Sequence, residues 1–373
     1  MKKHMLLLTL VLIGVLIMAP ASWGASSSEY VIGFAGPLTG ASAQDGESAR
    51  RGVEIAVKQV NAEGGIDGKT VRISVQDDKT DPKEAAIVAN KLVQDQSIVA
   101  VVGHFNSSCT LAGAPIYGNG SLPHIAFGSS SPAVSQTGPF TFRTIPTDDV
   151  GGRFSAQWAF NEYDVKKAAI MYENTDYGLG VLSVFEDECA KNGIEIVAKE
   201  SYLIGETTDF TTSITRIRSL APDLLFLGSL YNEAALIAKQ SAILGLDVPM
   251  ASVDGLYSHA LIELGGPDVE GITFAAFFSD SNPDPLVQDF VAAYQADYGS
   301  VPSTYAAYAF DATLVILDAL KNAGGDRRKI QEHISNIDGI PGVTGLNAFD
   351  ENGDVSKSPV FVTIKDGVFT VIQ

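Results

Sequence analysis

A chain of 373 residues, 46% of them hydrophobic, exceeds what one hydrophobic core usually organises, so two domains are expected. Its formal net charge of −19 at pH 7 argues against nucleic acid and anionic membrane surfaces as partners. The cysteines Cys109 and Cys189 lie far apart and lack the spacing of metal ligands. An oxidising compartment would allow a disulfide between them, but we expect two buried thiols.

The first 24 residues have the pattern of a secretory signal peptide. Lys2 and Lys3 give a positive start, residues 6–18 form an apolar run, and small residues follow up to Ala25. A membrane anchor is the alternative, but it usually needs roughly 20 apolar residues. We therefore expect cleavage near Ala25 and export of a soluble mature chain. Its formal charge would be −21, since removal of both lysines takes two positive charges from −19.

From residue 30 onward, short strand-like runs alternate with longer helical ones. The predicted strands are 30–35, 71–77, 98–103, 124–128, 168–172, 194–202, 224–228, 250–253 and 272–276. The predicted helices are 46–62, 82–95, a stretch ending at 117, 178–192, 208–220, 231–245, 284–298 and 305–321. This alternation is typical of parallel sheets with helices on both faces. Since each half carries several strands, an α/β chain with two doubly wound parallel-sheet lobes is favoured over one large sheet.

Two further segments bear on how the halves connect. The short boundary at residues 143–147, with the sequence RTIPT, predicts a hinge rather than a long linker. Residues 360–364 and 368–372 alternate as paired strands about Asp366 and Gly367, which predicts a hairpin at the end of the chain.

The sequence carries no catalytic signature. Residues 178–180 are too short for a dinucleotide-binding glycine loop, and neither a phosphate loop nor an H-E-x-x-H zinc motif occurs. His104 beside Ser107 could suggest nucleophilic catalysis, but a histidine that hydrogen-bonds backbone at a strand end is the favoured interpretation. We therefore expect no enzymatic activity, no cofactor and no metal.

Small hydroxyl residues follow two of the predicted strands. The loop containing Ser107 comes after strand 98–103, and residues 128–130 (GSS) come after the strand that begins at 124. Ligands of open α/β sheets bind outside the carboxyl ends of the strands. Hydroxyl and backbone N–H groups at a helix start can hold a carboxylate without a basic side chain. The sequence thus indicates an anion site, although these serines would serve equally well as helix caps alone.

Acidic and aromatic residues follow strands of the second half. Asp254 comes directly after strand 250–253 and could pair with an ammonium group; a solvated loop aspartate is the alternative. Tyr177 and Tyr231 also stand at strand ends, where a ring can form the wall of a pocket.

Several segments resemble the periplasmic Leu/Ile/Val-binding proteins, the substrate receptors of branched-chain amino acid ABC importers. The resemblance covers the mature chain and is carried by IGFAGPLTG (32–40), RRGVEIAVKQVNAEGGI (50–66), DDKTDPKEA (77–85), VGHFNSS (102–108), NTDYG (174–178) and TYAAY (304–308). It implies a type I periplasmic binding fold, with two lobes joined by three crossovers. A chain of this kind would act as a monomeric, soluble receptor in the periplasm. One lobe would comprise residues 25–145 and about 277–347, and the other 146–276 and about 348–373.

The resemblance also assigns roles to individual residues. Ser107 and Ser130 look like the hydroxyls that hold the ligand carboxylate, with backbone of Gly128 and Ser129 beside them, and Asp254 like the partner of the α-ammonium. The side-chain pocket would contain Tyr177, Tyr231, Tyr305, Phe105 and Asp45. The expected function is capture of a free aliphatic or branched-chain L-amino acid by hinge closure, with transfer to a membrane permease. A receptor for an amide, a urea or an aromatic acid is the alternative within the same fold.

The sequence departs from the family pattern in two places. Asp45 stands where an aromatic contact with the ligand side chain is common, which suits a polar or cationic side chain; alternatively it points to solvent and caps the following helix. Thr80 and Asn106 replace a pair of cysteines found in some members, which removes a staple from the first lobe but leaves the fold intact.

Overall fold

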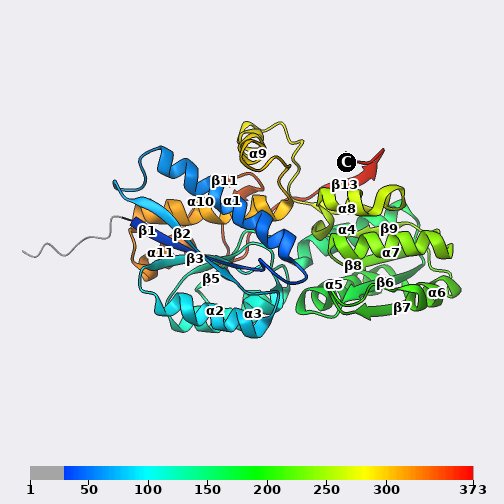
Figure 1. Ribbon diagram of the computed structural model, residues 1–373. Helices are drawn as coiled ribbons and strands as arrows, with labels where there is room; N and C mark the ends of the chain where they lie inside the picture. The colour runs from blue at the N-terminus through cyan, green and yellow to red at the C-terminus, as the bar shows by residue number, and fades with distance from the viewer. Residues whose placement is uncertain (1–28, 373) are drawn as a thin grey trace, which may run out of the picture.

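The computed structural model describes residues 29–372 and forms two halves side by side, each with its own sheet (Figure 1). The predicted signal peptide lies outside these residues. Within the described residues, no helix is both long enough and apolar enough to cross a membrane.

The first half, here called the first lobe, contains a five-stranded parallel sheet in the order β2-β1-β3-β4-β5. Its strands are β1 (Glu29–Gly36), β2 (Thr70–Asp77), β3 (Ile98–Gly103), β4 (His124–Ala126) and β5 (Thr141–Arg143). Its helices are α1 (Ala43–Ala62), α2 (Pro82–Gln94), α3 (Ser107–Asn119), α9 (Pro285–Tyr298), α10 (Thr304–Ala323) and α11 (Arg327–Ser335). Helices α2 and α3 cover one face and α1 and α10 the other, which explains why β3 is buried along its whole length (Figure 1).

The second half, the second lobe, contains a seven-stranded sheet in the order β14-β13-β10-β9-β8-β6-β7. Its strands are β6 (Lys167–Glu173), β7 (Glu195–Tyr202), β8 (Leu224–Gly228), β9 (Met250–Ser252), β10 (Thr273–Ala276), β13 (Val360–Lys365) and β14 (Val368–Ile372). Its helices are α4 (Asp148–Glu162), α5 (Asp176–Asn192), α6 (Thr211–Ser219), α7 (Tyr231–Leu244) and α8 (His259–Gly265). Strands β6 to β10 run parallel, whereas β13 and β14 form the predicted antiparallel hairpin at the edge.

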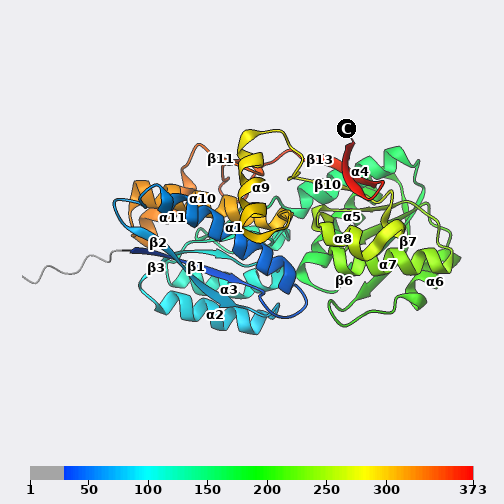
Figure 2. The ribbon, with the colours of Figure 1, turned by 45° about the horizontal axis from the view of Figure 1, so that its top comes forward.

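Short elements complete the fold. They are the hairpin of β11 (Ile340–Gly342) and β12 (Gly345–Asn347) and the 3₁₀ turns η1 (Pro132–Gln136), η2 (Asp254–Leu256) and η3 (Gly266–Val269). Helices α1, α9 and α10 pack together on the first lobe although they come from distant parts of the chain (Figure 2).

The chain crosses between the two lobes three times within the described residues. The crossings fall at residues 144–147, 277–284 and 348–359, between elements that belong to different sheets. Two doubly wound lobes with a three-crossover connection are therefore confirmed.

Local signals explain why several boundaries match the prediction. Helix α2 begins at Pro82, and the Asp81 carboxylate accepts hydrogen bonds from the backbone N–H groups of Lys83 (2.7 Å) and Glu84 (3.0 Å). The periodicity did not predict α4, which contains Gly151 and Gly152, poor helix formers. Tertiary packing stabilises this helix, which lies against α5, β9 and β10.

Cys109 in α3 and Cys189 in α5 are both buried, free thiols, as we expected from the sequence. The disulfide alternative is wrong because the two thiols lie in different lobes.

Candidate ligand-binding site

A narrow pocket lies between the lobes, beside the carboxyl ends of strands from both sheets. It is lined by Phe105, Asn106, Ser107, Gly128, Glu173, Tyr177, Leu230 and Tyr305. The cavity volume is only about 10 Å³, about the space that one water molecule needs. The side chains of the two lobes therefore nearly fill the pocket, and the lobes are closed on each other at this place.

Five of the ten predicted site residues line this pocket: Phe105, Ser107, Gly128, Tyr177 and Tyr305. Ser129 and Ser130 continue the loop from Gly128. Asp254, Tyr231 and Asp45 do not line the pocket, and their positions are described one by one below. Glu173, Leu230 and Asn106 line the pocket but were not predicted.

The serine loops form an end of the pocket rich in hydrogen-bond donors. Ser107 is the first residue of α3 and is 1% exposed, so the N–H groups and dipole of a 13-residue helix point toward this place. Its hydroxyl accepts a hydrogen bond from the backbone N–H of Ser131 (3.3 Å). The interpretation of Ser107 as a helix cap only is wrong, because Asn106 holds the cap position and α3 has no side-chain cap.

The neighbouring loop approaches Ser107 closely. Gly128 must lack a side chain, since a Cβ there would lie 2.3 Å from the Phe105 ring. The Ser129 hydroxyl donates to the Phe105 carbonyl (3.0 Å) and pairs with the Thr110 hydroxyl (2.6 Å), so this side chain is occupied inside the lobe. The backbone of this loop, and not the Ser129 hydroxyl, is the part that remains for a ligand.

Arg143, at the end of β5, holds the serine loop from behind. Its guanidinium is 1% exposed and donates to the carbonyls of Ser129 (3.1 Å) and Ser131 (2.8 Å) and to the Asp354 carboxylate (2.5 Å). Asp354 belongs to the third crossing, so the loop is tied to the connection between the lobes. Sequence reasoning assigned Arg143 only to the hinge; its pairing with a residue 211 positions away left no local signal.

Asp254 opens η2 and is 6% exposed, so the alternative of a solvated aspartate is wrong. Burial raises the pKa of its carboxyl to about 6, and a hydrogen bond from Tyr308 opposes the rise. The Tyr308 hydroxyl donates to Asp254 Oδ2 at 2.9 Å. Because Tyr308 lies on α10 of the first lobe, this bond crosses the cleft. Tyr308 was missed as a site residue, although it follows Tyr305 by one helical turn.

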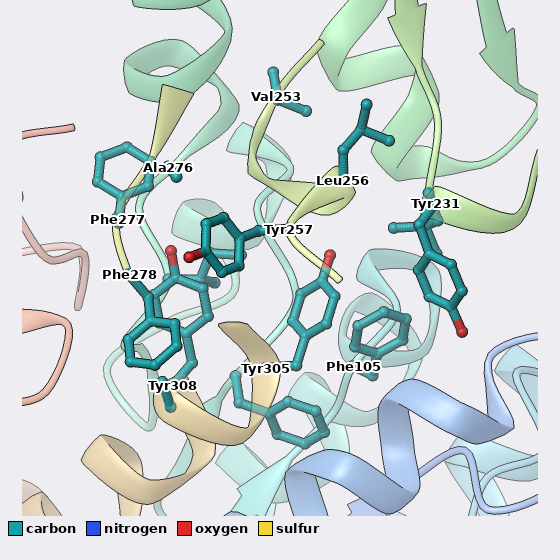
Figure 3. Packing of buried hydrophobic residues seen from close by; sticks show 14 of the residues in the cluster. Phe105, Tyr231, Val253, Leu256, Tyr257, Ala276, Phe277, Phe278, Tyr305 and Tyr308 are labelled. Atoms are coloured by element: carbon teal, nitrogen blue, oxygen red, sulfur yellow. The ribbon is translucent and has the colours of Figure 1, made fainter. Parts of the chain in front are cut away.

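The predicted aromatic walls are buried but do not all face the pocket. The Tyr305 and Phe105 rings meet edge to face, with 4.6 Å between their centroids. The Tyr177 hydroxyl donates to the Ser229 carbonyl at 3.5 Å. Figure 3 shows Tyr231 away from Tyr308, with its hydroxyl directed toward α1. That hydroxyl has no hydrogen-bond partner among the described residues.

Asp45, in the first turn of α1, is 2% exposed. The alternative, that Asp45 points to solvent and caps the helix, is wrong on both counts. The side chain is buried, and Ser42 holds the cap position. Asp45 lines a different and larger cavity, between α1, residues 258–263 and residues 294–303. Burial, and then the charge of Glu233, raise the pKa of its carboxyl to about 8.

Two further buried carboxyl groups lie near the pocket. Glu173 ends β6; its Oε1 accepts from the Thr175 hydroxyl (2.7 Å), whereas Oε2 has no partner in the described chain. Burial raises its pKa to about 8, and Glu233 and Asp148 add to the rise. Asp148 starts α4, and burial likewise raises its pKa to about 8 against a hydrogen bond from Ser130.

The geometry offers no nucleophile and base pair at His104. Its Nδ1 pairs with Asp78 Oδ2 (2.7 Å) and its Nε2 with the Tyr117 hydroxyl (3.1 Å), all fully buried. The prediction that the His104 ring bonds to the backbone is therefore wrong. Neither ring nitrogen bonds to Ser107. Among residues 29–372, no group of three or more His, Cys, Asp or Glu is arranged to hold a metal ion.

Comparisons with known proteins agree with this architecture. Residues 29–367 match the family model described as periplasmic binding protein. The Leu/Ile/Val-binding protein homolog 1 of Brucella suis is 32% identical over 96% of this chain and 98% of that protein. A crystal structure of a leucine-binding protein from Thermotoga maritima is 29% identical, covers 92% of this chain and 97% of its own, and has a TM-score of 0.85. A branched-chain amino acid transporter substrate-binding protein from Streptococcus pneumoniae, in complex with isoleucine, is 27% identical, covers 92% and 99%, and has a TM-score of 0.86.

Proposed function

This chain belongs to the periplasmic binding protein family, and from that premise we propose that it is the extracytoplasmic receptor of an amino-acid ABC importer. It captures a free L-amino acid by closing its two lobes and carries out no chemistry on it. The observation that carries the proposal is the polarity of the site: donors gather at Ser107 and the 128–130 loop, while the Asp254 carboxylate lies within reach of the same cleft.

The ligand's carboxylate docks first on the first lobe. It accepts hydrogen bonds from the hydroxyls of Ser107 and Ser130 and from backbone N–H groups of Gly128 and Ser129, at the positive end of α3. Among residues 29–372, no cationic side chain lines the pocket, so fixed dipoles hold the carboxylate. Arg143 acts from behind by keeping the loop in place.

Closure brings the second lobe onto the ligand's other groups. Asp254 pairs with the α-ammonium, because its carboxyl is ionised above a pKa of about 6. Leu230 and Tyr177 from the second lobe and Phe105 and Tyr305 from the first surround the carbon chain of the ligand's side chain. These apolar walls suit the carbon part of an amino-acid side chain, and the names of the relatives state leucine, isoleucine and valine for those proteins.

The unit that closes on each side is a lobe assembled from two stretches of chain. Residues 25–145 with about 277–347 form one, and residues 146–276 with about 348–373 form the other; the membership of β13 and β14 in the second sheet supports this division.

Contacts across the cleft stabilise the closed form; one is the hydrogen bond from the Ser108 hydroxyl to Asp176 Oδ2 (2.6 Å). A ligand that touches both lobes shifts the population toward that form, which a membrane permease then recognises. The receptor is exported by its signal peptide and works as a monomer.

A thermal-shift and calorimetry panel tests the function with the mature chain. The twenty amino acids, small amides and aromatic acids are compared, and an α-amino acid should stabilise the protein most. Asp254→Asn should lower the affinity for that amino acid by about 30-fold or more, because a buried ammonium loses its charged partner. Asp187→Asn, an exposed acid on α5 of the same lobe, is the control and should bind normally. Stabilisation by amides or aromatic acids alone would overturn the proposal.

A further inference from the structure

The side-chain end of the cleft holds more buried carboxyl groups than an amino acid with a neutral side chain can use. Resting on the proposed function, we propose that the preferred ligand is an α-amino acid whose side chain ends in a cation, the class of lysine, ornithine and arginine. Asp45, Glu173 and Glu233 form the site for that cation. They are distinct from Asp254, which serves the α-ammonium.

Unpartnered acceptors carry the first step of the argument. Asp45 Oδ2, Glu173 Oε2 and Asn106 Oδ1 are buried without a hydrogen-bond partner in the described part of the chain. All three are acceptor oxygens when the carboxyls are ionised. Buried polar atoms in native proteins are almost always satisfied, so the ligand is expected to bring donors. The side chains of leucine, isoleucine and valine bring none, whereas an ammonium or guanidinium group brings several.

The charges carry the second step. Asp45 comes from α1, Glu173 from the end of β6 and Glu233 from the first turn of α7, and they are 2%, 1% and 6% exposed. Burial is the largest cause that raises the pKa of Asp45 and Glu173, and the charges of other carboxyls, Glu233 among them, raise both further. Like charges brought together out of water oppose closure unless a cation, or protons, join them. A basic side chain supplies that cation.

The placement of these groups sets the shape of the ligand. Glu173 and Asn106 line the pocket itself, whereas Asp45 lines a separate cavity. The two places are linked, because the Asn106 amide bonds Ser42 at 3.5 Å, three residues before Asp45, and the Asp45 charge acts on Glu173. The charges of both Asp254 and Asp45 act on the Tyr305 hydroxyl, so both carboxyls lie near this pocket residue. The unpartnered Tyr231 hydroxyl, directed toward α1 and close enough to Asp45 to feel its charge, offers one more acceptor there (Figure 3). A flexible apolar stem along Phe105 and Tyr305, ending in a cation that these carboxyls hold, fits this set of groups.

Calorimetry with matched ligands tests the inference at pH 7.5. L-Norleucine has the carbon stem of L-lysine without the terminal ammonium, and Nε-acetyl-L-lysine keeps the length without the charge. We expect L-lysine to bind at least about 10-fold more tightly than either, as close charge pairs in buried sites do. Asp45→Asn and Glu173→Gln should each lower the ratio of lysine affinity to norleucine affinity about 10-fold or more. Asp187→Asn should change neither, and thermal melting of each variant verifies that it is folded.

The outcomes separate this inference from the proposed function. If norleucine, leucine or glutamine binds as tightly as the three basic amino acids, the cation site is refuted, while an effect of Asp254→Asn on that binding keeps the receptor function. If no α-amino acid binds and only amides or aromatic acids do, both are refuted. If lysine is preferred but Asp45→Asn and Glu173→Gln leave that preference unchanged, the assignment of the cation to these carboxyls is refuted.

Discussion

The hydrogen bond between Tyr308 and Asp254 gives a sharp prediction about closure. The donor lies on α10 of the first lobe and the acceptor on η2 of the second, with 2.9 Å between the oxygens and both residues buried. A hydrogen bond to a charged group is worth about 1.5–3 kcal/mol. Tyr308→Phe should therefore weaken amino-acid binding by roughly 10- to 150-fold, because the bond forms only when the lobes meet.

Titration calorimetry of four proteins isolates this pair. They are the native chain, Tyr308→Phe, Asp254→Asn and the double variant. In the Asp254→Asn background a neutral hydrogen bond remains, so the cost of removing the Tyr308 hydroxyl should fall to about 0.5–1.5 kcal/mol. Tyr298→Phe is the matched control, since the Tyr298 hydroxyl also bonds a carboxylate, Glu54 at 2.8 Å, but within the first lobe. A cost that is the same in both backgrounds, or an equal loss in Tyr298→Phe, would refute the role of this bond in closure.

Two other predictions concern buried titratable groups. Burial raises the pKa of Asp45, Asp148 and Glu173 to about 8 in the closed, ligand-free form, whereas a carboxyl in water titrates at about pH 4. The closed form should therefore keep its full stability below about pH 4 and lose it as the pH rises toward about 8. Without ligand, the radius of gyration from small-angle X-ray scattering should thus grow between about pH 5 and about pH 8, and it should grow less in Asp45→Asn. A radius of gyration that does not change with pH in the native chain would contradict this. Burial also raises the pKa of the Cys109 thiol, and it raises the pKa of the Cys189 thiol to about 12. Neither thiol should therefore react with a thiol reagent at pH 8 until the chain is unfolded in guanidinium. Rapid labelling of the native protein would contradict this, because it would show that the thiols are accessible.

Much of the fold was readable from the sequence because its signals are local. The run at 224–228 is a strand with both faces covered, and the Asp81-Pro82 pair starts a helix through its own cap; neither depends on distant residues. Elements with weak local signals were not predicted: α4 contains two glycines, and β5 and β12 are three residues long. Their stability comes from packing on neighbours that the sequence does not identify.

The candidate site divides in the same way. Residues that directly follow strands, such as Ser107, Gly128 and Tyr177, could be predicted, because the carboxyl ends of parallel strands meet at one edge of the sheet. The burial of Asp45, the cross-cleft partner of Asp254 and the support from Arg143 could not. Asp254 and Tyr308 are 54 positions apart and Arg143 and Asp354 are 211 apart, so no periodicity or motif links them. Whether a carboxyl faces water or a closed cleft depends on what the second lobe places over it, and that is decided only when both lobes are folded and joined.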